Sequence, residues 1–479
     1  MTALCPADAA FLARLAAKLP DDTLGPAEPR YLQEPRGLYQ GQAGALARPR
    51  STAEVATILR HATAARVPVV PFGGGTGLVG GQVSGEGPAP LVVSLDRMTA
   101  RRGVDTLAGT LTVEAGAVLA DVQAEAEAAG KLFPLSLASE GSARIGGLLS
   151  TNAGGVNVVR YGNARDLVLG IEAVLPTGDV LHGLKGLRKD NLGYDLRHLL
   201  IGAEGTLGII TAACLRLVPR PADQATALMV VDSPADALRL LDMTRDRVGD
   251  GLSAFELIAR AGLEFLDEVG PDLRQPFAEK PAWMCLIDLG LARGQSAAGA
   301  LMELFEAAAE AGLVQDGLIS QSEAQRQDFW SIREFIPEAN KRVGAISSHD
   351  ISVPIGTIPA FLQEGPRRVA HLGAVRINAF GHLGDGNLHY NVFPPKGEAR
   401  DGWLDRREEI KYILHDLVQE LGGSVSAEHG VGRLKVGDLE RYGDPASLVA
   451  MHAIKAALDP AGIMNPGAVL RTGGPVSQK

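Results

Sequence analysis

Two histidines flank a short glycine-rich stretch, and their types and spacing make them candidates for metal chemistry. His382 and His389 enclose Gly-Asp-Gly-Asn, a composition that favours a turn. Their separation, 389 − 382 = 7, is odd. On one straight strand the two rings would therefore point to opposite faces, and a chain reversal is needed to bring them together. Glu428, within SAEHGVGR, is a candidate third ligand, since two imidazoles and a carboxylate suit a catalytic zinc or similar divalent ion.

The same residues also allow a structural interpretation. Histidines beside a glycine turn can cap strand ends by hydrogen bonding, and Glu428 can be a surface carboxylate. The spacing is not a compact metal motif of the H-E-x-x-H type, so metal binding and structural capping both remain open on spacing alone. Asn391 stands two residues after His389, which would place both on one face of a strand.

Glycine is unusually abundant, with 58 residues in 479, and it gathers in three clusters at 73–77, 141–155 and 201–210. Backbone N–H groups in such clusters can approach a pyrophosphate closely, and Thr76 adds a hydroxyl. No Gly-Lys-Ser/Thr follows the first cluster, and the spacing is not the dinucleotide fingerprint. One cluster alone is typical of a flexible loop, but three beside apolar strands favour a large phosphate-bearing cofactor.

Arg333, in FWSIREFIP, is a candidate for carboxylate binding. Its planar fork matches a carboxylate, and the local sequence predicts that it lies at the start of a helix. A solvated helix arginine is the alternative.

The elements that must position these residues follow from periodicity and turn signals. Ser51 and Glu54 predict a capping box before a helix over 55–62. A turn by composition at 176–179 separates two strands, and Pro219-Arg220-Pro221 predicts a domain boundary. The predicted strands cover 67–70, 91–95, 110–115, 167–175, 180 onward, 228–231, 254–258, 283–289 and 375–379, and a further apolar strand follows the glycine cluster 201–210 and ends near 218. The predicted helices cover 118–129, 235–243, 297–312, 404–421 and 447–458.

The composition excludes several classes of protein. The net charge is 46 − 56 = −10, which argues against nucleic-acid binding, and the 46% apolar content is that of a globular chain. Three scattered cysteines make no disulfide framework. We find no signal peptide and no apolar run that would form a transmembrane helix, so we expect a cytoplasmic enzyme.

Six motifs occur in one order along the chain: PFGGGTGLVGG, PLSLASEGSARIGGLLSTNAGG, GYDLRHLLIGAEGTLGIIT, GHLGDGNLHYNV, SAEHGVG and LDPAGIMNPG. Over about residues 46–470 the chain resembles the FAD-dependent D-2-hydroxy-acid dehydrogenases of the vanillyl-alcohol oxidase/p-cresol methylhydroxylase superfamily. The resemblance implies an α+β fold with a two-subdomain FAD-binding domain and an α+β cap domain that has an antiparallel sheet. The expected ranges are 1–219 for the FAD domain (core from about 46), 220–420 for the cap or substrate domain, and 421–479 for a helical segment that returns to the FAD domain.

The resemblance also implies which residues bind FAD. The flavin is expected to be noncovalent, because residues 71–81 contain no histidine that could link it. The residues expected along the pyrophosphate, isoalloxazine and adenosine parts of FAD are Gly73, Gly74, Gly75, Thr76, Gly77, Leu78, Leu135, Ser136, Gly141, Ser142, Gly146, Gly147, Thr151, Asn152, Gly154, Gly155, Glu204, Gly205, Gly208, Ile210 and Asn465.

For the substrate site, the resemblance implies that His382, His389 and Glu428 bind a metal, most often Zn²⁺. Asn391 and His429 match the substrate-contact position and the general base, and Arg333 matches the residue that holds a distal carboxylate. The sequence departs from that pattern at Ser348, where relatives often carry Lys, and at Pro337, where a helper Thr is expected. Both departures weaken the case for a second carboxylate on the substrate. Two cationic residues, Arg333 and Lys341, still favour such a carboxylate.

The implied reaction is oxidation of a D-2-hydroxy acid to the 2-oxo acid, with D-2-hydroxyglutarate as the expected substrate and D-lactate or glycolate as alternatives. His429 would act as the base, and hydride would pass to flavin N5. The expected partners are a small 2-hydroxy acid and an electron acceptor such as an electron-transfer flavoprotein or a quinone, and a homodimer is the expected assembly. From other classes, a metal-dependent hydrolase or a flavin-binding electron carrier would also use parts of this residue set.

Overall fold

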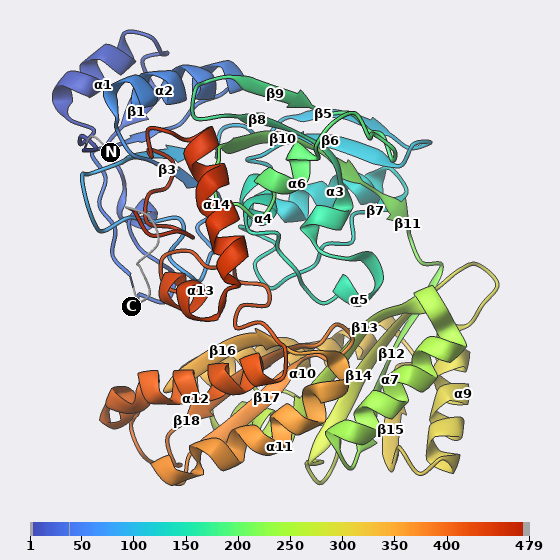
Figure 1. Ribbon diagram of the computed structural model, residues 1–479. Helices are drawn as coiled ribbons and strands as arrows, with labels where there is room; N and C mark the ends of the chain where they lie inside the picture. The colour runs from blue at the N-terminus through green and yellow to red at the C-terminus, as the bar shows by residue number, and fades with distance from the viewer. Residues whose placement is uncertain (1–2, 38, 473–479) are drawn as a thin grey trace. The chain divides into compact units, whose positions relative to one another are not determined.

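The computed structural model describes residues 3–37 and 39–472, and their contacts divide the chain into two compact units. The first unit contains Met1–Gly155, Gly162–Arg220 and Glu428–Lys479, and the second contains Val156–Tyr161 and Pro221–Ala427. The short helix α5 (Val158–Tyr161) therefore belongs with the second unit. In Figure 1 the first unit combines blue and green elements with the red carboxyl-terminal segment.

The first sheet of the first unit is small and mostly parallel, with the order β1-β2-β4-β3. Its strands are β1 (Leu24–Gly25), β2 (Ala45–Ala47), β3 (Val69–Phe72) and β4 (Leu91–Ser94), and β2 and β3 both run parallel to β4. Helix α2 (Thr52–Ala65) connects β2 to β3. The Ser51 side chain accepts a hydrogen bond from Glu54 N, which confirms the predicted start of this helix. Helix α1 (Ala9–Ala16) packs against α2.

The second sheet of the first unit is antiparallel, with the order β5-β6-β10-β8-β9. Its strands are β5 (Arg101–Asp105), β6 (Thr110–Glu114), β8 (Val168–Val174), β9 (Val180–Gly183) and β10 (Ile209–Arg216). Helix α3 (Leu119–Ala128) ends just before Gly130, whose φ of +70° suits glycine and ends the helix as expected. Short elements complete this region: α4 (Ile145–Ser150), α6 (Leu196–Leu200), and the pair β7 (Lys131–Leu132) and β11 (Val218–Pro219).

Residues 428–472 return to the first sheet. Helices α13 (Val436–Tyr442) and α14 (Pro445–Leu458) are followed by a segment in which Met464 forms a parallel β-bridge with Val69 of β3. Lys455 Nζ lies 2.7 Å from each of three oxygens, Thr206 O, Met464 O and Asp459 Oδ2. The tail therefore joins the first unit beside β3, as the position of α14 in Figure 1 also indicates.

The second unit is built on a seven-stranded sheet with the order β15-β12-β14-β13-β17-β18-β16. All of its strand pairs are antiparallel, which confirms the expected cap architecture. The strands are β12 (Asp223–Val231), β13 (Leu252–Ala259), β14 (Trp283–Leu291), β15 (Asp316–Ile319), β16 (Ser347–Ser352), β17 (Arg376–His382) and β18 (Asn387–Phe393).

Helices cover both faces of this sheet. One face packs against α7 (Pro234–Val248), α9 (Ala297–Glu310), α11 (Ile358–Val369) and α12 (Arg407–Glu420), through residues such as Leu240, Leu304, Phe361, Leu414 and Leu257. The opposite face packs against α8 (Arg260–Val269) and α10 (Glu323–Val343), where Ile336, Phe380 and Phe393 are buried together. The alternation of side chains along each strand separates these two cores.

Two expectations about local structure were incomplete. Arg333 does not begin a helix but lies inside α10, which starts at Glu323 behind the N-cap Ser322 and continues through Pro337. Strands β15, β16 and β18 were not predicted, because β15 has only 4 residues (DGLI) and because β16 and β18 carry several polar residues and lack a long apolar run. Among the described residues, no helix is both long and apolar enough to cross a membrane.

Candidate functional site

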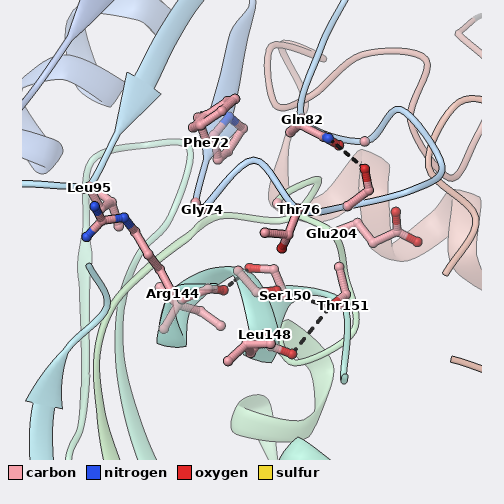
Figure 2. A pocket seen from close by; sticks show the side chains of 18 of the residues that line it. Phe72, Gly74, Thr76, Gln82, Leu95, Arg144, Leu148, Ser150, Thr151 and Glu204 are labelled. Carbon is pink, nitrogen blue, oxygen red and sulfur yellow. Dashed lines mark hydrogen bonds between the residues drawn. The ribbon is translucent and has the colours of Figure 1, made fainter. Parts of the chain in front are cut away.

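The first glycine cluster lines a cavity of the first unit. The loop from Gly73 to Gly77 follows β3, at the carboxyl end of a parallel strand, where α/β sheets place their ligands. The cavity has an empty volume of about 920 Å³, including its open mouth, and the facing wall comes from α4 and the start of β10. Figure 2 shows Gly74 and Thr76 on one side of it and Leu148, Ser150 and Thr151 on the other.

Glycine is required where the loop meets α4 and the residues just before it. A Cβ on Gly74 would lie 2.3 Å from Ser142 O, and one on Gly73 would lie 3.1 Å from the Cα of Gly147. At Gly74 the obstacle is backbone, which cannot rotate away as a flexible side chain can. The close approach of two backbone segments explains why glycines gather in both clusters.

Many of the residues expected to bind FAD line this one cavity: Gly73, Gly74, Gly75, Thr76, Gly77, Gly146, Gly147, Thr151, Glu204, Gly205, Gly208 and Ile210. Other expected residues are outside its lining: Leu78, Leu135, Ser136, Gly141, Ser142, Asn152, Gly154, Gly155 and Asn465.

A second cavity lies at the same glycine loop, with an empty volume of about 1030 Å³. Gly73, Gly74 and Gly75 line both cavities, and Gly141 and Ser142 line the second. Its other walls include Arg30, Tyr31 and Asp96, which lie far from the glycine clusters in the sequence. Arg48 Nη2 lies 2.9 Å from Asp96 Oδ2; burial alone would raise the pKa of Asp96, but this arginine lowers it overall.

Several lining residues were not predicted. Gln82 donates from Nε2 to Gly77 O at 2.8 Å and so braces the glycine loop, as Figure 2 shows. Leu95, Leu148 and Ser150 line the first cavity, and Arg144 lines both cavities. An isolated arginine just before a glycine-rich helix could have signalled this role.

Glu204 lines the first cavity and has a left-handed backbone conformation. Its φ is +50°, which is uncommon for a residue other than glycine. Its carboxylate accepts hydrogen bonds from Val431 N at 2.7 Å and Gly432 N at 2.8 Å, and burial raises its pKa. Glu204 therefore anchors the backbone that follows His429, in addition to lining the cavity.

Asn465 belongs to the same network. It is buried and donates from Nδ2 to Glu204 O at 2.8 Å and to Gly81 O at 2.9 Å. Arg433 donates to Asn465 Oδ1 at 2.8 Å and also to the carbonyls of Gly80 and Gly81. The network ties the carboxyl-terminal segment to the loop that lines the cavity.

His429, the expected base, also lines the first cavity. Its ring is partly accessible, with 27% of the side chain exposed, and its Nε2 lies 3.9 Å from Glu428 Oε1. The imidazole of His429 is therefore accessible beside the glycine loops, and accessibility is one of the properties that a general base needs. Glu428 is the first residue of the segment that belongs to this unit.

In the second unit, the predicted chain reversal brings His382 and His389 together. They lie on the adjacent strands β17 and β18, and their ring centroids are 5.4 Å apart. Asp385 in the turn accepts from Asn387 N at 3.1 Å, and burial raises the pKa of Asp385 to about 6. Two imidazoles at this separation, on a rigid hairpin, fit a shared metal ion.

Each histidine has a carboxylate neighbour that was not predicted. Glu256 on β13 is directly opposite His382 in the strand register, and His382 Nδ1 lies 2.6 Å from Glu256 Oε1. Asp350 on β16 is opposite His389, and His389 Nδ1 lies 4.0 Å from Asp350 Oδ1. A carboxylate beside the second ring nitrogen is typical of histidines that bind metals. A lone glutamate inside the apolar strand 254–258 was the available signal for Glu256.

Arg333 is bound to this same glutamate. It is buried, and its Nε donates to Glu256 Oε2 at 2.6 Å while its guanidinium lies over the Phe380 ring at 4.7 Å. Burial by itself would raise the pKa of Glu256, but His382 and Arg333 outweigh it and lower this pKa to about 2. The solvated-arginine alternative is therefore wrong.

The remaining expected residues of this region are placed as follows. Asn391 is buried on β18, two residues from His389, so the two share a face of the strand. Lys341 and Ser348 are exposed, and Pro337 lies within α10. Of the two cations expected to favour a second substrate carboxylate, Arg333 lies beside the histidine hairpin, since it shares Glu256 with His382.

Two family models match the chain. One, described as FAD binding domain, covers residues 43–183, and the other, described as FAD linked oxidases, C-terminal domain, covers residues 220–469. The chain therefore carries an FAD-binding domain followed by the C-terminal domain of FAD-linked oxidases.

Curated relatives are similar over most of their length. The D-2-hydroxyglutarate dehydrogenase of Stutzerimonas stutzeri is 39% identical over 88% of this chain and 89% of the relative. That of Xanthomonas citri is 38% identical over 89% of each chain. A probable mitochondrial D-2-hydroxyglutarate dehydrogenase of Oryza sativa is 38% identical over 91% of this chain and 76% of the relative.

Solved structures agree on the fold at lower identity. p-Cresol methylhydroxylase has a TM-score of 0.76 against this chain, with 17% identity over 98% of this chain and 99% of its own. An alkyldihydroxyacetonephosphate synthase has a TM-score of 0.72 over 97% of this chain and 86% of its own, also at 17% identity. The chain belongs to the FAD-linked oxidase family, in the branch of the D-2-hydroxyglutarate dehydrogenases.

Proposed function

We propose that this protein oxidises a D-2-hydroxy acid to the corresponding 2-oxo acid, with D-2-hydroxyglutarate as the first candidate substrate. The observation that carries the proposal is that His429 lines the cavity formed by the glycine clusters, within the unit that contains the FAD-binding domain. The glycine-lined walls and the volume of the two cavities at one loop fit a long dinucleotide. FAD, when bound, supplies a hydride acceptor.

The chain's own residues supply the proton chemistry and the positioning. His429 takes the proton from the substrate hydroxyl, since histidine is the side chain most often used as a general base. Asn391 contacts the substrate from the strand that also carries His389. The glycine loop excludes side chains from the cofactor path, and Gln82 keeps that loop in place.

We propose that His382, His389 and Glu428 bind a divalent metal ion, with zinc as the first candidate. The support is the chemistry of the donors, namely two adjacent imidazoles and a carboxylate, and the carboxylates beside the second ring nitrogens. A metal of this kind, when bound, lowers the pKa of a coordinated hydroxyl. The ligands alone accept several divalent ions.

Arg333 is proposed to bind the distal carboxylate of the substrate. D-lactate, which has no such group, is a second candidate, and one observation favours it: the charge of Arg333 is already paired with Glu256. The absence of Lys at Ser348 and of Thr at Pro337 supports the same alternative.

The test is an anaerobic reduction panel on the purified yellow protein. We expect D-2-hydroxyglutarate to bleach the flavin absorbance fastest, with D-lactate, D-malate and glycolate slower and the L-forms inactive. Faster bleaching by D-lactate would favour the monocarboxylate alternative. A colourless protein would favour the hydrolase, and a yellow protein that no hydroxy acid bleaches would favour an electron carrier.

We further propose an electron-transfer flavoprotein or a quinone as acceptor, a homodimeric assembly and a cytoplasmic location. The support is the family membership and the names of the bacterial relatives, which carry no organelle, whereas those of the plant and animal relatives say mitochondrial. Acceptor assays, sedimentation and cell fractionation test the three points.

A further inference from the structure

Glu256 joins two of the side chains proposed for substrate oxidation. It is fully buried in the middle of β13, and its two carboxylate oxygens have different partners. Oε1 lies 2.6 Å from His382 Nδ1 on β17, and Oε2 accepts from Arg333 Nε on α10 at 2.6 Å. One carboxylate thus connects a proposed metal ligand with the proposed carboxylate-binding arginine.

We propose that Glu256 is a positioning residue that holds His382 in the tautomer required for metal binding and at the same time fixes the side chain of Arg333. This inference rests on the proposed function, and it assigns a role to a residue outside the proposed ligand set.

The tautomer follows from the hydrogen bond. A carboxylate paired with an arginine only accepts hydrogen bonds, so His382 Nδ1 must carry the hydrogen that points to Oε1. The neutral imidazole then has its lone pair on Nε2, and this is the tautomer in which Nε2 can coordinate a metal. Such a carboxylate also fixes the ring orientation of a histidine ligand.

Glutamine at this position cannot serve both partners. Its oxygen can accept from either Arg333 or His382, and its NH₂ group must then face the other one. Facing Arg333, the amide N–H would meet the Nε–H donor. Facing His382, it would require Nδ1 to accept, which moves the hydrogen to Nε2 and removes the lone pair needed for the metal.

Asp288 provides a matched control in the same sheet. It is buried on β14, where its Oδ1 accepts from Thr226 Oγ1 at 2.5 Å and from Arg326 Nε at 2.9 Å. Asp288→Asn therefore also neutralises a buried, arginine-paired carboxylate, but one that has no proposed metal ligand as a partner.

The experiment compares Co²⁺ binding by the wild-type flavoprotein, Glu256→Gln and Asp288→Asn after metal removal. The visible bands of Co²⁺, read as a difference spectrum against the flavin, report occupancy without turnover. We expect Glu256→Gln to bind Co²⁺ roughly 10- to 100-fold more weakly than wild type, the usual effect of losing such an outer partner. Asp288→Asn should bind as wild type does.

A second readout is KM for D-2-hydroxyglutarate. We expect this KM to rise about tenfold in Glu256→Gln, because Arg333 would be displaced. A tenfold change is what the loss of one charge-assisted hydrogen bond would produce. If Glu256→Gln does not fold, Glu256→Asp keeps the charge but is too short to reach both partners, and it should weaken Co²⁺ binding as well.

The outcomes separate the two proposals. Wild-type Co²⁺ affinity in a folded Glu256→Gln, or equal weakening in Asp288→Asn, would overturn the role of Glu256 alone. Wild-type protein that binds no Co²⁺ would overturn the proposed metal site, and the positioning role with it.

Discussion

Single side chains determine the chemistry of the histidine hairpin. His389 is half-buried on β18, beside His382 and opposite Asp350. Replacing a proposed ligand by alanine would remove one donor from the proposed metal ion without disturbing the strand ladder, because the ladder uses only backbone groups.

We expect His389→Ala to fold and to keep its yellow flavin, but to lose turnover by roughly 100-fold or more, since metal assistance is worth several kcal/mol and each ~1.4 kcal/mol is tenfold. Stopped-flow reduction by D-2-hydroxyglutarate measures this. His371→Ala, at an exposed ring in the same unit, is the control and should react normally. Near-wild-type reduction by His389→Ala would remove this residue from the proposed ligands.

At the scale of elements, the loop after β3 and the segment before α4 approach as only glycine permits. Gly74→Ala would place a Cβ 2.3 Å from Ser142 O and force two backbone segments apart. Overpacking of this kind costs about 1–3 kcal/mol of free energy in the conformation that forms the cavity. We therefore expect FAD affinity to fall roughly tenfold or more. The flavin-to-protein absorbance ratio and an FAD titration measure this loss.

Gly103→Ala on the exposed strand β5 is the control, because nothing lies within 4 Å of the added Cβ. Equal FAD content in both variants would show that the glycine loop does not determine FAD binding.

A second element-scale feature is Glu172, which connects helix α2 with the second sheet of the first unit. From β8 its carboxylate accepts from Thr52 Oγ1 at the start of α2 at 2.6 Å and from Thr211 Oγ1 on β10 at 2.9 Å, and it pairs with Arg102 on β5. Burial raises its pKa, but these partners outweigh burial and lower the pKa below 4.5.

A lowered carboxyl pKa stabilises the folded state above the unfolded pKa, and this contribution is lost as the pH falls through the folded pKa. We expect Glu172→Gln to lose about 1–3 kcal/mol of unfolding free energy at pH 7, because a buried charge-assisted network is broken. The deficit should shrink below pH 4.5, the ordinary value for this group.

Urea unfolding at pH 7, 5 and 4 measures this dependence, with the exposed Glu86→Gln as control. A deficit that stayed constant across the three pH values would show that the charge of Glu172 is not what stabilises the contact between α2 and the second sheet.

For the whole molecule, the glycine-lined cavity and the histidine hairpin belong to different compact units. We therefore expect a chelator to remove the proposed metal ion while FAD stays bound. Flavin absorbance should persist after EDTA and gel filtration, anaerobic reduction by D-2-hydroxyglutarate should fall at least tenfold, and added Zn²⁺ should restore it. Unchanged reduction in metal-free protein would contradict a metal-assisted reaction.

Much of the architecture could be predicted from the sequence. The apolar strands β4, β6, β8, β12 and β14 and the capped helix α2 follow from local periodicity and local hydrogen bonding. Polar edge strands such as β16 could not be predicted, because their stability comes from pairing with distant strands.

The sequence by itself determined the chemical classes: glycine clusters where backbone must approach backbone and a ligand, two histidines across a turn, and an arginine beside aromatic residues. Only the tertiary structure decided which charges share a buried position. It placed Glu256 opposite His382 and within reach of Arg333, although 126 and 77 residues separate them in the chain. A buried carboxylate must be satisfied by whatever donors the fold brings beside it, and local sequence carries no record of those distant partners.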